Sequence, residues 1–260
     1  MTKNHGDSVK VSIIISVLNG AKTLQNCLDS IFSQDYNNIE LVVVDGGSTD
    51  ETVQILRNNE DIITNWLSEP DSGVYDAWNK GLEIVTGEYI CFMGCDDRFA
   101  QKSSVSEILS LNDSEYCSDL ITSKICLVDE NGKSLQERGN PWKWSKMMKD
   151  CYVTHPGLMH HKRLFERHGK FDTRYKIAGD YEFLLRLGSK TSTKHLNKVT
   201  VLMGINGISN VNSLKAHEEA RMIHSSHPSI GKASALYNYY ISRLKVFVKL
   251  VLINKGLKHK

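Results

Sequence analysis

Short apolar runs alternate with segments whose apolar residues recur every three or four positions over residues 11–93. Unbroken β-branched runs predict strands covered on both faces, and the longer spacing predicts amphipathic helices. Ser48 and Glu51 have the spacing of a capping box at the start of one helix. The predicted strands are 11–17, 41–44, 62–67 and 89–93, and the predicted helices are 24–32, 53–56 and 74–85. This alternation predicts a mostly parallel α/β sheet with right-handed crossovers.

The pattern changes after residue 100, where apolar and polar positions no longer alternate between strand and helix signals. Asp129 and the three residues after it predict a hairpin turn between two β-rich segments. The predicted strands here are 120–123, 125–128 and 199–203, and the predicted helices are 181–187 and 214–225. A second, differently built half of the chain is therefore expected.

Composition and charge narrow the class of protein. The chain has 260 residues, 40% hydrophobic and 24% charged, with a net charge of +2, as expected for a globular protein with a sizeable core. No apolar run is long enough to span a membrane, and the first residues lack the core of a signal peptide, so a cytoplasmic location is predicted. The six cysteines have no zinc-site spacing.

The end of the chain is strongly basic. Residues 220–260 carry eight Lys or Arg side chains and no acidic one, and residues 236–253 mix aromatic, apolar and basic positions. Such a segment favours an interfacial helix on anionic lipid, at the inner face of the cell membrane. A helix packed on the rest of the enzyme or on a partner protein is the alternative, and a nucleic-acid partner is not predicted.

Acidic residues follow three of the predicted strands, at the edge where open parallel sheets bind ligands. They are Asp45, Asp71 and the pair Asp96–Asp97. Adjacent carboxylates repel each other unless a cation offsets their charge, and Mg²⁺ or Mn²⁺ held by carboxylates and substrate phosphates fits this need. Turn formation and helix capping are the structural alternatives for such acids. A P-loop and a Gly-x-Gly-x-x-Gly motif are both absent from the sequence, which disfavours common nucleotide-binding enzymes.

Four segments in the same order resemble the family 2 glycosyltransferases, most closely bacterial members that build surface polysaccharides. They are residues 11–19, 44–52, 69–81 and 87–97. The resemblance implies a GT-A fold, a Rossmann-like mostly parallel sheet with flanking helices, together with a nucleotide-sugar donor and inversion at the anomeric carbon. It implies a nucleotide-sugar-binding half over 1–100 and an acceptor-binding half with the catalytic base over 101–213. The charge and apolar pattern adds a basic amphipathic helical region over 214–260.

The resemblance also implies roles for individual residues of the donor site. The segment lining the nucleotide base would contribute Ser16, Val17 and Asn19. Asp45 would hydrogen-bond the base, and Asp71 and Asn79 would help to close the nucleotide pocket.

The resemblance further assigns the metal site to the paired acids. Asp96 would lie near the ribose or diphosphate, and Asp97 would bind the metal ion. Cys95 occupies the first position of the family's D-x-D-like motif, so the site would rest on Asp97.

Residues 171–187 resemble the family segment that carries the catalytic acid ahead of a helix. Asp180 aligns with the Asp of a frequent Glu-Asp pair, and an inverting transfer needs one carboxylate to accept the proton of the acceptor hydroxyl. A helix N-cap is the alternative role for this residue, and Glu182 is a poorer candidate because it lies on another helix face. His155 would bind acceptor or phosphate, unless it is purely structural.

We therefore interpret the chain as a metal-dependent, inverting glycosyltransferase using Mg²⁺ or Mn²⁺. It would move a sugar from a nucleoside-diphosphate sugar to a hydroxyl of a glycan or lipid-linked acceptor in the synthesis of capsule, O-antigen, lipopolysaccharide or exopolysaccharide. A sugar nucleotidyltransferase and a catalytically silent nucleotide-sugar-binding subunit are the alternatives.

Overall fold

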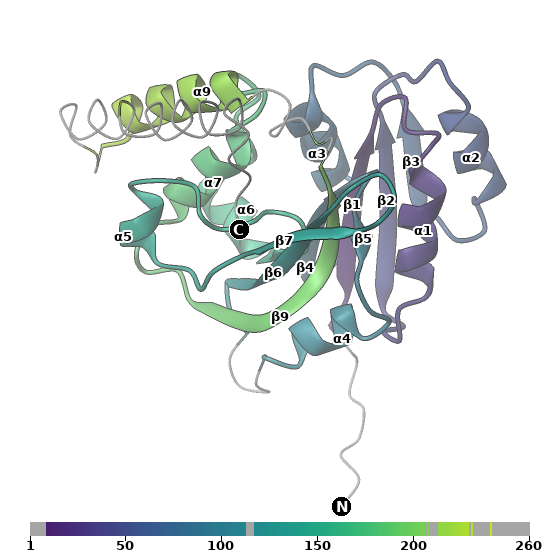
Figure 1. Ribbon diagram of the computed structural model, residues 1–260, viewed down its shortest axis with the longest axis horizontal. Coiled ribbons are helices and arrows are strands. Elements are labelled where there is room, and N and C mark those ends of the chain that lie inside the picture. The colour runs from purple at the N-terminus through teal and green to yellow at the C-terminus, as the bar shows by residue number, and fades with distance from the viewer. Residues whose placement is uncertain are drawn as a thin grey trace, which may run out of the picture.

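The computed structural model describes residues 9–112, 117–205, 207, 213–228, 230 and 240. Their strands form one nine-stranded sheet in the order β3-β2-β1-β4-β8-β6-β9-β5, with β7 paired to β6 (Figure 1). The strands are β1 Val11–Val17, β2 Ile39–Asp45, β3 Asn65–Ser68, β4 Tyr89–Gly94, β5 Arg98–Phe99, β6 Leu120–Val128, β7 Ser134–Arg138, β8 Met159–His161 and β9 Thr193–Gly204. The helices are α1 Leu24–Phe32, α2 Thr52–Asn58, α3 Val74–Leu82, α4 Ser104–Leu109, α5 Trp144–Met147, α6 Arg163–His168, α7 Gly179–Leu187 and α9 Ser213–Ser226.

The parallel sheet predicted for the first half is confirmed. β1 pairs in parallel with both β2 and β4, and β2 pairs in parallel with β3. The register sets Val17 beside Asp45 and Ser16 beside Gly94. The carboxyl ends of three strands therefore meet at one edge of the sheet, where the donor-site acids are predicted to lie.

Helices cover both faces of this part of the sheet, which explains the unbroken apolar runs. Ile13 and Ile15 of β1 pack in the same core as α1, whereas Ile14 packs in the core that contains α3 and α7. All three side chains are fully buried. A strand buried on both faces has no position for a solvent-facing polar residue, so its sequence does not alternate.

The second half extends the same sheet with antiparallel and parallel strands. β8 pairs antiparallel to β4 and to β6, and β9 runs parallel to β6. The predicted hairpin is confirmed, because Asp129 and Lys133 close the turn between β6 and β7. The two predicted strands around Lys124 form one strand, and the pairing with β9 shifts register there.

The strand predicted for 199–203 begins earlier, at Thr193, and the helix predicted for 74–85 ends at Leu82. Two further local predictions are wrong. Ser48 does not cap α2, since its hydroxyl donates to Asp45 and Asp50 Oδ1 instead accepts from the Thr52 N–H at 3.0 Å. The third strand starts at Asn65 rather than at residue 62 because a turn after α2 uses the preceding backbone. In both places local hydrogen bonds of a polar side chain or a turn set the end of the element. The pattern of apolar residues does not predict these hydrogen bonds.

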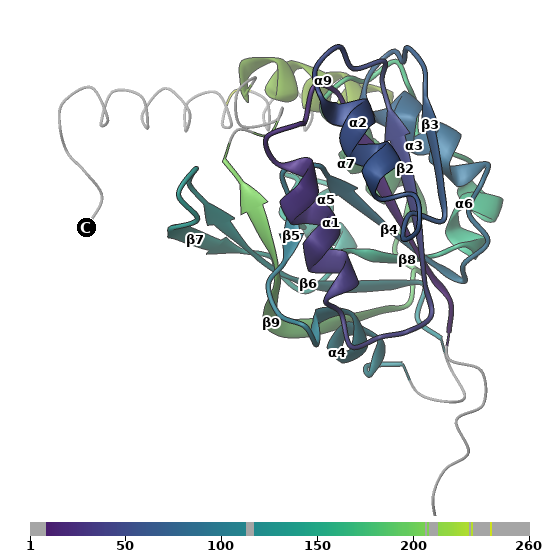
Figure 2. The same cartoon turned by 90° about the vertical axis from the view of Figure 1, so that its right-hand side faces the viewer.

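The last described helix lies beside the second half of the sheet. α9 packs against α7 at the end of the molecule opposite α4 (Figure 1; Figure 2). Among the described helices, none combines the length and the apolar character needed to cross a membrane. The segment 236–253, for which lipid contact is predicted, lies outside the described residues except for Tyr240, whose side chain is exposed. Cytoplasmic location and lipid contact stay predictions.

Candidate active site

The loops after β1 and β2 are joined by side chains predicted to bind a nucleotide. Asp45 is fully buried and accepts hydrogen bonds from the Ser48 N–H at 3.0 Å and the Ser68 hydroxyl at 2.6 Å. Asn19, at φ 52°, accepts from the Thr49 N–H at 2.9 Å through Oδ1. Ser16 is half-buried and Val17 is buried beside them. These residues thus form one connected loop network at the strand ends.

Asp71 joins this network, whereas Asn79 does not. A Cβ placed on Gly46 would lie 2.5 Å from Asp71 Oδ2, so Asp71 packs directly against the loop after Asp45. The Asn79 side chain instead donates to the Phe171 carbonyl at 2.8 Å and accepts from the Phe171 N–H at 3.0 Å. Asn79 therefore clamps α3 to the segment that precedes α7, and its role at a nucleotide stays a prediction.

The paired acids after β4 differ in accessibility. Asp97 is 4% exposed and accepts a hydrogen bond from the Gly94 N–H at 2.9 Å. Asp96 is half-buried, and a Cβ on either Gly94 or Gly204 would lie 2.8 Å from one of its carboxylate oxygens. Two glycines therefore leave the space that Asp96 occupies. The structure makes Asp96, rather than Asp97, the carboxylate with access to a ligand.

The electrostatics of this pair favour a cation. Burial raises the pKa of Asp96, and burial together with the neighbouring Asp96 charge raises the pKa of Asp97. A bound divalent ion would offset both effects. Within the described part of the chain, no group of three or more His, Cys, Asp or Glu side chains could hold a metal by itself. The donor set fits Mg²⁺ or Mn²⁺ only if substrate phosphates complete the coordination.

Asp180 is the second residue of α7, which begins after Ala178 at the cap position, so the N-cap interpretation is wrong. Its Oδ1 accepts from the Tyr181 N–H at 2.8 Å and lies 2.9 Å from the Tyr75 hydroxyl. That hydroxyl is also 2.7 Å from the Ile177 carbonyl, and its single proton can serve only one of the two oxygens at a time. Burial raises the pKa of Asp180 above that of an exposed aspartate.

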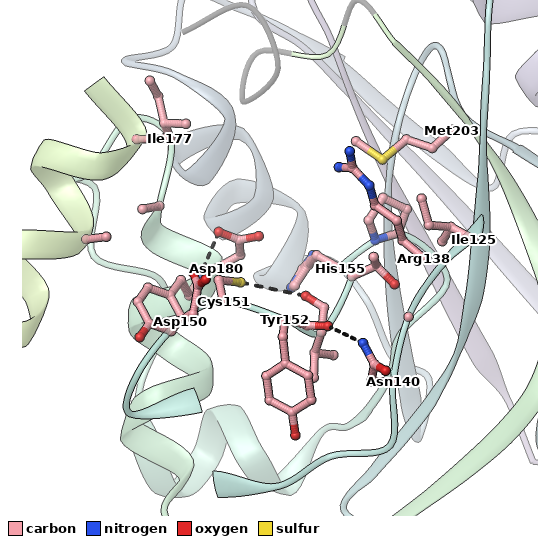
Figure 3. Close-up of a pocket in the computed structure, with 18 of the residues that line it drawn as sticks. Ile125, Arg138, Asn140, Asp150, Cys151, Tyr152, His155, Ile177, Asp180 and Met203 are labelled. Atoms are coloured by element: carbon pink, nitrogen blue, oxygen red, sulfur yellow. Dashed lines mark hydrogen bonds between the residues drawn. The ribbon is translucent and has the colours of Figure 1, made fainter. Parts of the chain in front are cut away.

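Asp180 and His155 line a cavity of about 640 Å³. Figure 3 places Asp180 and Ile177 on one side of it, and Arg138, Ile125 and Met203 on the other. The four donor-side acids are not among the residues that line this cavity: Asp45, Asp71, Asp96 and Asp97. The two regions adjoin through β9, because Met203 lines the cavity and the next residue, Gly204, packs against Asp96.

His155 is a polar side chain buried in an aromatic cluster. Its ring stacks on Trp78 with a centroid distance of 4.9 Å, and only 4% of the residue is exposed. Neither ring nitrogen has a hydrogen-bond partner among the described residues. Burial lowers the pKa of His155 to about 3, so the ring is neutral at pH 7. A neutral imidazole can hydrogen-bond a hydroxyl but offers no charge to a phosphate.

Two residues that contact the Asp180 region have no role predicted from the sequence. Tyr75 comes from α3, 105 positions before Asp180, and Glu219 comes from α9 and accepts from the backbone just before α7. The sequence could have pointed to Tyr75 only through the rule that a buried tyrosine hydroxyl usually has a hydrogen-bond partner. Which residue is that partner depends on the fold. Glu182, by contrast, pairs with Arg186 at 2.8 Å.

Sequence comparison identifies similar proteins. The sequence profile of the family described as Glycosyl transferase family 2 matches residues 12–169. A PGL/p-HBAD biosynthesis glycosyltransferase from Mycobacterium bovis (strain BCG / Pasteur 1173P2) is 31% identical over 195 residues, which cover 72% of this chain and 74% of that relative.

Structural comparison finds the same fold in solved glycosyltransferases. S. aureus TarS 1–349 in complex with UDP-GlcNAc superposes with a TM-score of 0.67 at 20% identity, covering 87% of this chain and 69% of that chain. The mannosyltransferase PcManGT from Pyrobaculum calidifontis, in complex with GDP-Man and Mn²⁺, superposes with a TM-score of 0.61 at 17% identity, covering 96% of this chain and 80% of that chain.

Proposed function

This chain belongs to glycosyltransferase family 2 and has the GT-A fold, and we propose that it is an inverting transferase that acts on a nucleoside-diphosphate sugar. The acceptor would be a hydroxyl of a glycan or lipid-linked molecule in surface glycan synthesis, as the name of the mycobacterial relative suggests. The observation that carries this proposal is Asp180, a carboxylate with a raised pKa that lines a cavity next to the donor edge of the sheet.

In this proposal Asp180 accepts the proton of the acceptor hydroxyl as its oxygen attacks the anomeric carbon. The new bond joins that oxygen to the carbon, and the bond from the carbon to the diphosphate breaks on the opposite face. The Tyr181 N–H donates to Oδ1, and the Tyr75 hydroxyl lies beside the same oxygen, which leaves the second carboxylate oxygen for the proton. The nucleoside diphosphate leaves from the side of the sheet edge that carries Asp96.

We assign the metal contact to Asp96, with Asp97 as its buried support, which exchanges the roles predicted from the sequence. Mg²⁺ or Mn²⁺ bound there with the donor's diphosphate would stabilise the charge that grows on the leaving phosphate. Asp97 is committed to the Gly94 N–H and fixes the loop that carries Asp96. Asn19 and Asp71 would hold the nucleoside at the adjoining loops. The fully buried Asp45 would fix these loops through its hydrogen bonds with Ser48 and Ser68.

A binding screen tests the donor class directly. We expect one of UDP, UDP-GlcNAc, GDP and GDP-mannose to raise the melting temperature with Mn²⁺ or Mg²⁺ present, and not with EDTA. Saturation at 100 times Kd stabilises by about 2.7 kcal/mol. That corresponds to a rise of about 5–10 °C for a chain of this size. If no nucleotide shifts the melting temperature with either metal, the proposed donor site is wrong.

Product analysis separates the transferase from its alternatives. Release of nucleoside diphosphate from the bound donor is expected of a transferase, and inversion is read from the anomeric configuration of the product. Release of pyrophosphate from a nucleoside triphosphate would instead indicate a sugar nucleotidyltransferase. Binding of donor without turnover, across acceptors, would indicate a silent binding subunit.

Replacement of His155 by Phe is expected to reduce transfer while leaving the melting temperature unchanged or higher. Unpartnered buried polar atoms cost about 1–3 kcal/mol, and Phe fits the same aromatic stack without them. Both ring nitrogens are buried without a partner among the described residues, so the proposed hydrogen bond to a substrate hydroxyl requires that substrate binding opens one of them to the cavity. The substitution would remove that hydrogen bond. The measurement is nucleoside diphosphate release with a panel of lipid-linked and glycoside acceptors, alongside thermal unfolding.

His160→Phe is the matched control for this substitution. His160 is fully buried, has an unpartnered Nε2 within the described residues, and does not line the cavity. Its Nδ1 lies 3.3 Å from the Ile90 carbonyl, so His160→Phe also removes one contact within the core. We expect its transfer rate to equal that of the wild type. Equal losses of activity in the two variants, or a lower melting temperature for His155→Phe alone, would show that His155 acts only in packing.

A further inference from the structure

The backbone that leads into Asp180 is held by a carboxylate from the last described helix. Glu219 of α9 accepts hydrogen bonds from three consecutive N–H groups, those of residues 176, 177 and 178. The donor-acceptor distances to Oε2 are 3.1, 2.9 and 2.9 Å, and the residue 176 N–H also lies 3.0 Å from Oε1. Glu219 is only 7% exposed. The Glu219 carboxylate therefore binds the backbone in a buried site and is not part of a surface ion pair.

The position of this contact gives it a chemical consequence. Successive backbone N–H groups that converge on one point form a concave anion site. They also lie at the N-terminus of α7, where unpaired N–H groups and the helix dipole favour a negative charge. Ala178, the last of the three donors, is two residues before Asp180. Displacement of this turn would therefore move the proposed base directly.

A second contact from α9 holds the other side of Asp180. His224 Nε2 lies 2.5 Å from the Tyr181 hydroxyl, and Tyr181 follows Asp180 in α7. Tyr181 also contacts the Met147 carbonyl through the same hydroxyl. Residues of α9, among them Ala216 and Ala220, line the cavity that Asp180 faces. α9 thus contacts the chain on both sides of Asp180, at residues 176–178 and at Tyr181, and it forms part of the cavity wall.

We propose that Glu219 is a positioning residue for sugar transfer, which holds the 176–178 turn so that Asp180 faces the acceptor. The inference rests on the proposed function of Asp180. It goes beyond the family match, because that match ends at residue 169 and both α7 and α9 follow it. Under this proposal, α9 is an integral part of the active site and not an appended tail.

Hydrogen exchange tests the contact without a substrate. In Glu219→Ala, the amides of residues 176–178 are expected to exchange faster than in the wild type, because they lose their acceptor. Glu218→Gln is the matched control, since Glu218 is the neighbouring carboxylate of the same helix and is exposed. Its exchange pattern should equal that of the wild type. Unchanged protection of residues 176–178 in a folded Glu219→Ala protein would overturn the proposal.

The kinetic arm uses release of nucleoside diphosphate from UDP-GlcNAc and GDP-mannose. We expect Glu219→Ala to lower kcat on the order of 10²-fold, as for a displaced catalytic group, with the Kd for donor unchanged. Glu219→Gln keeps an acceptor oxygen and should recover part of kcat. It should also shift the acid limb of the pH profile to lower pH, because the Glu219 charge contributes to the raised pKa of Asp180, after burial as the main cause.

The groups facing Asp180 from other elements are Tyr75 of α3 and Cys151 of the loop before β8, and both remain unchanged in these variants. A kcat for Glu219→Gln as low as that of Glu219→Ala would mean that an acceptor oxygen at position 219 does not position Asp180, and would overturn the proposal. A wild-type chain that releases no nucleoside diphosphate, while Glu219→Ala still exposes the three amides, would instead overturn the proposed function of the chain.

Discussion

Replacement of Asp180 by Asn is expected to lower sugar transfer by about 10²–10⁴-fold while leaving donor binding intact, because a general base contributes a factor of that size. Asn keeps an oxygen that can accept from the Tyr181 N–H, as Asp180 Oδ1 does at 2.8 Å, so the start of α7 should be preserved. What the amide cannot do is accept the proton of the acceptor hydroxyl. The measurements are kcat with saturating donor and acceptor, and the Kd for donor.

The pH dependence of the wild-type rate is an independent test of Asp180 as the general base. Burial raises the pKa of Asp180 from its ordinary value of about 3.9. A base must be deprotonated to act, so kcat/KM should fall as pH decreases through this raised pKa, and the fall should begin at a higher pH than for an exposed Asp. The Asn variant should lack this limb.

Glu182→Gln is the control for the Asp180 variant. Glu182 lies two residues further along α7 and pairs with Arg186 at 2.8 Å, away from the lining of the cavity. Its loss should leave transfer close to the wild-type rate. Wild-type turnover by Asp180→Asn, or a loss of activity matched by a loss of donor binding, would contradict the assignment of Asp180 as the base.

The donor half of the molecule could be predicted because its information is local. The run that includes Ile13 and Ile15 is buried on both faces, and the acids that follow the strands must lie at their carboxyl ends whatever the rest of the chain does. Position at a strand end is a property of the segment itself. The family resemblance then supplied the chemistry for these positions, including Asp180 at the start of a helix.

The parts that could not be predicted depend on long-range contacts and burial. Asp96 and Asp97 are adjacent and chemically identical, and only the packing of Gly94 and Gly204 determines which carboxylate stays accessible. The partner of Asp180 is a tyrosine 105 residues earlier. Asn79 carries the polar side chain of a motif, yet it binds the backbone of Phe171. Spacing along a sequence contains none of this information.

Replacement of Asp96 by Asn is expected to abolish the metal-dependent rise in melting temperature with donor and to lower kcat/KM by about two to three powers of ten. A metal ion contributes several kcal/mol of charge stabilisation, and each 1.36 kcal/mol is tenfold in rate. Without metal or donor, the variant should be at least as stable as the wild type, because the substitution removes a buried like-charge pair with Asp97.

Asp97→Asn is the comparison that makes this test discriminating, since the two acids are neighbours and lose the same charge. The amide oxygen introduced by this substitution can still accept from the Gly94 N–H, so the loop after β4 should persist and the metal-dependent shift should survive in weakened form. Thermal unfolding with UDP or GDP, in Mn²⁺ and in EDTA, measures both variants. If Asp97→Asn abolishes the shift and Asp96→Asn keeps it, the ligand is Asp97. In that case Asp96 would contact the ribose or the diphosphate instead. Its half-buried carboxylate between Gly94 and Gly204 is accessible to either part of the donor.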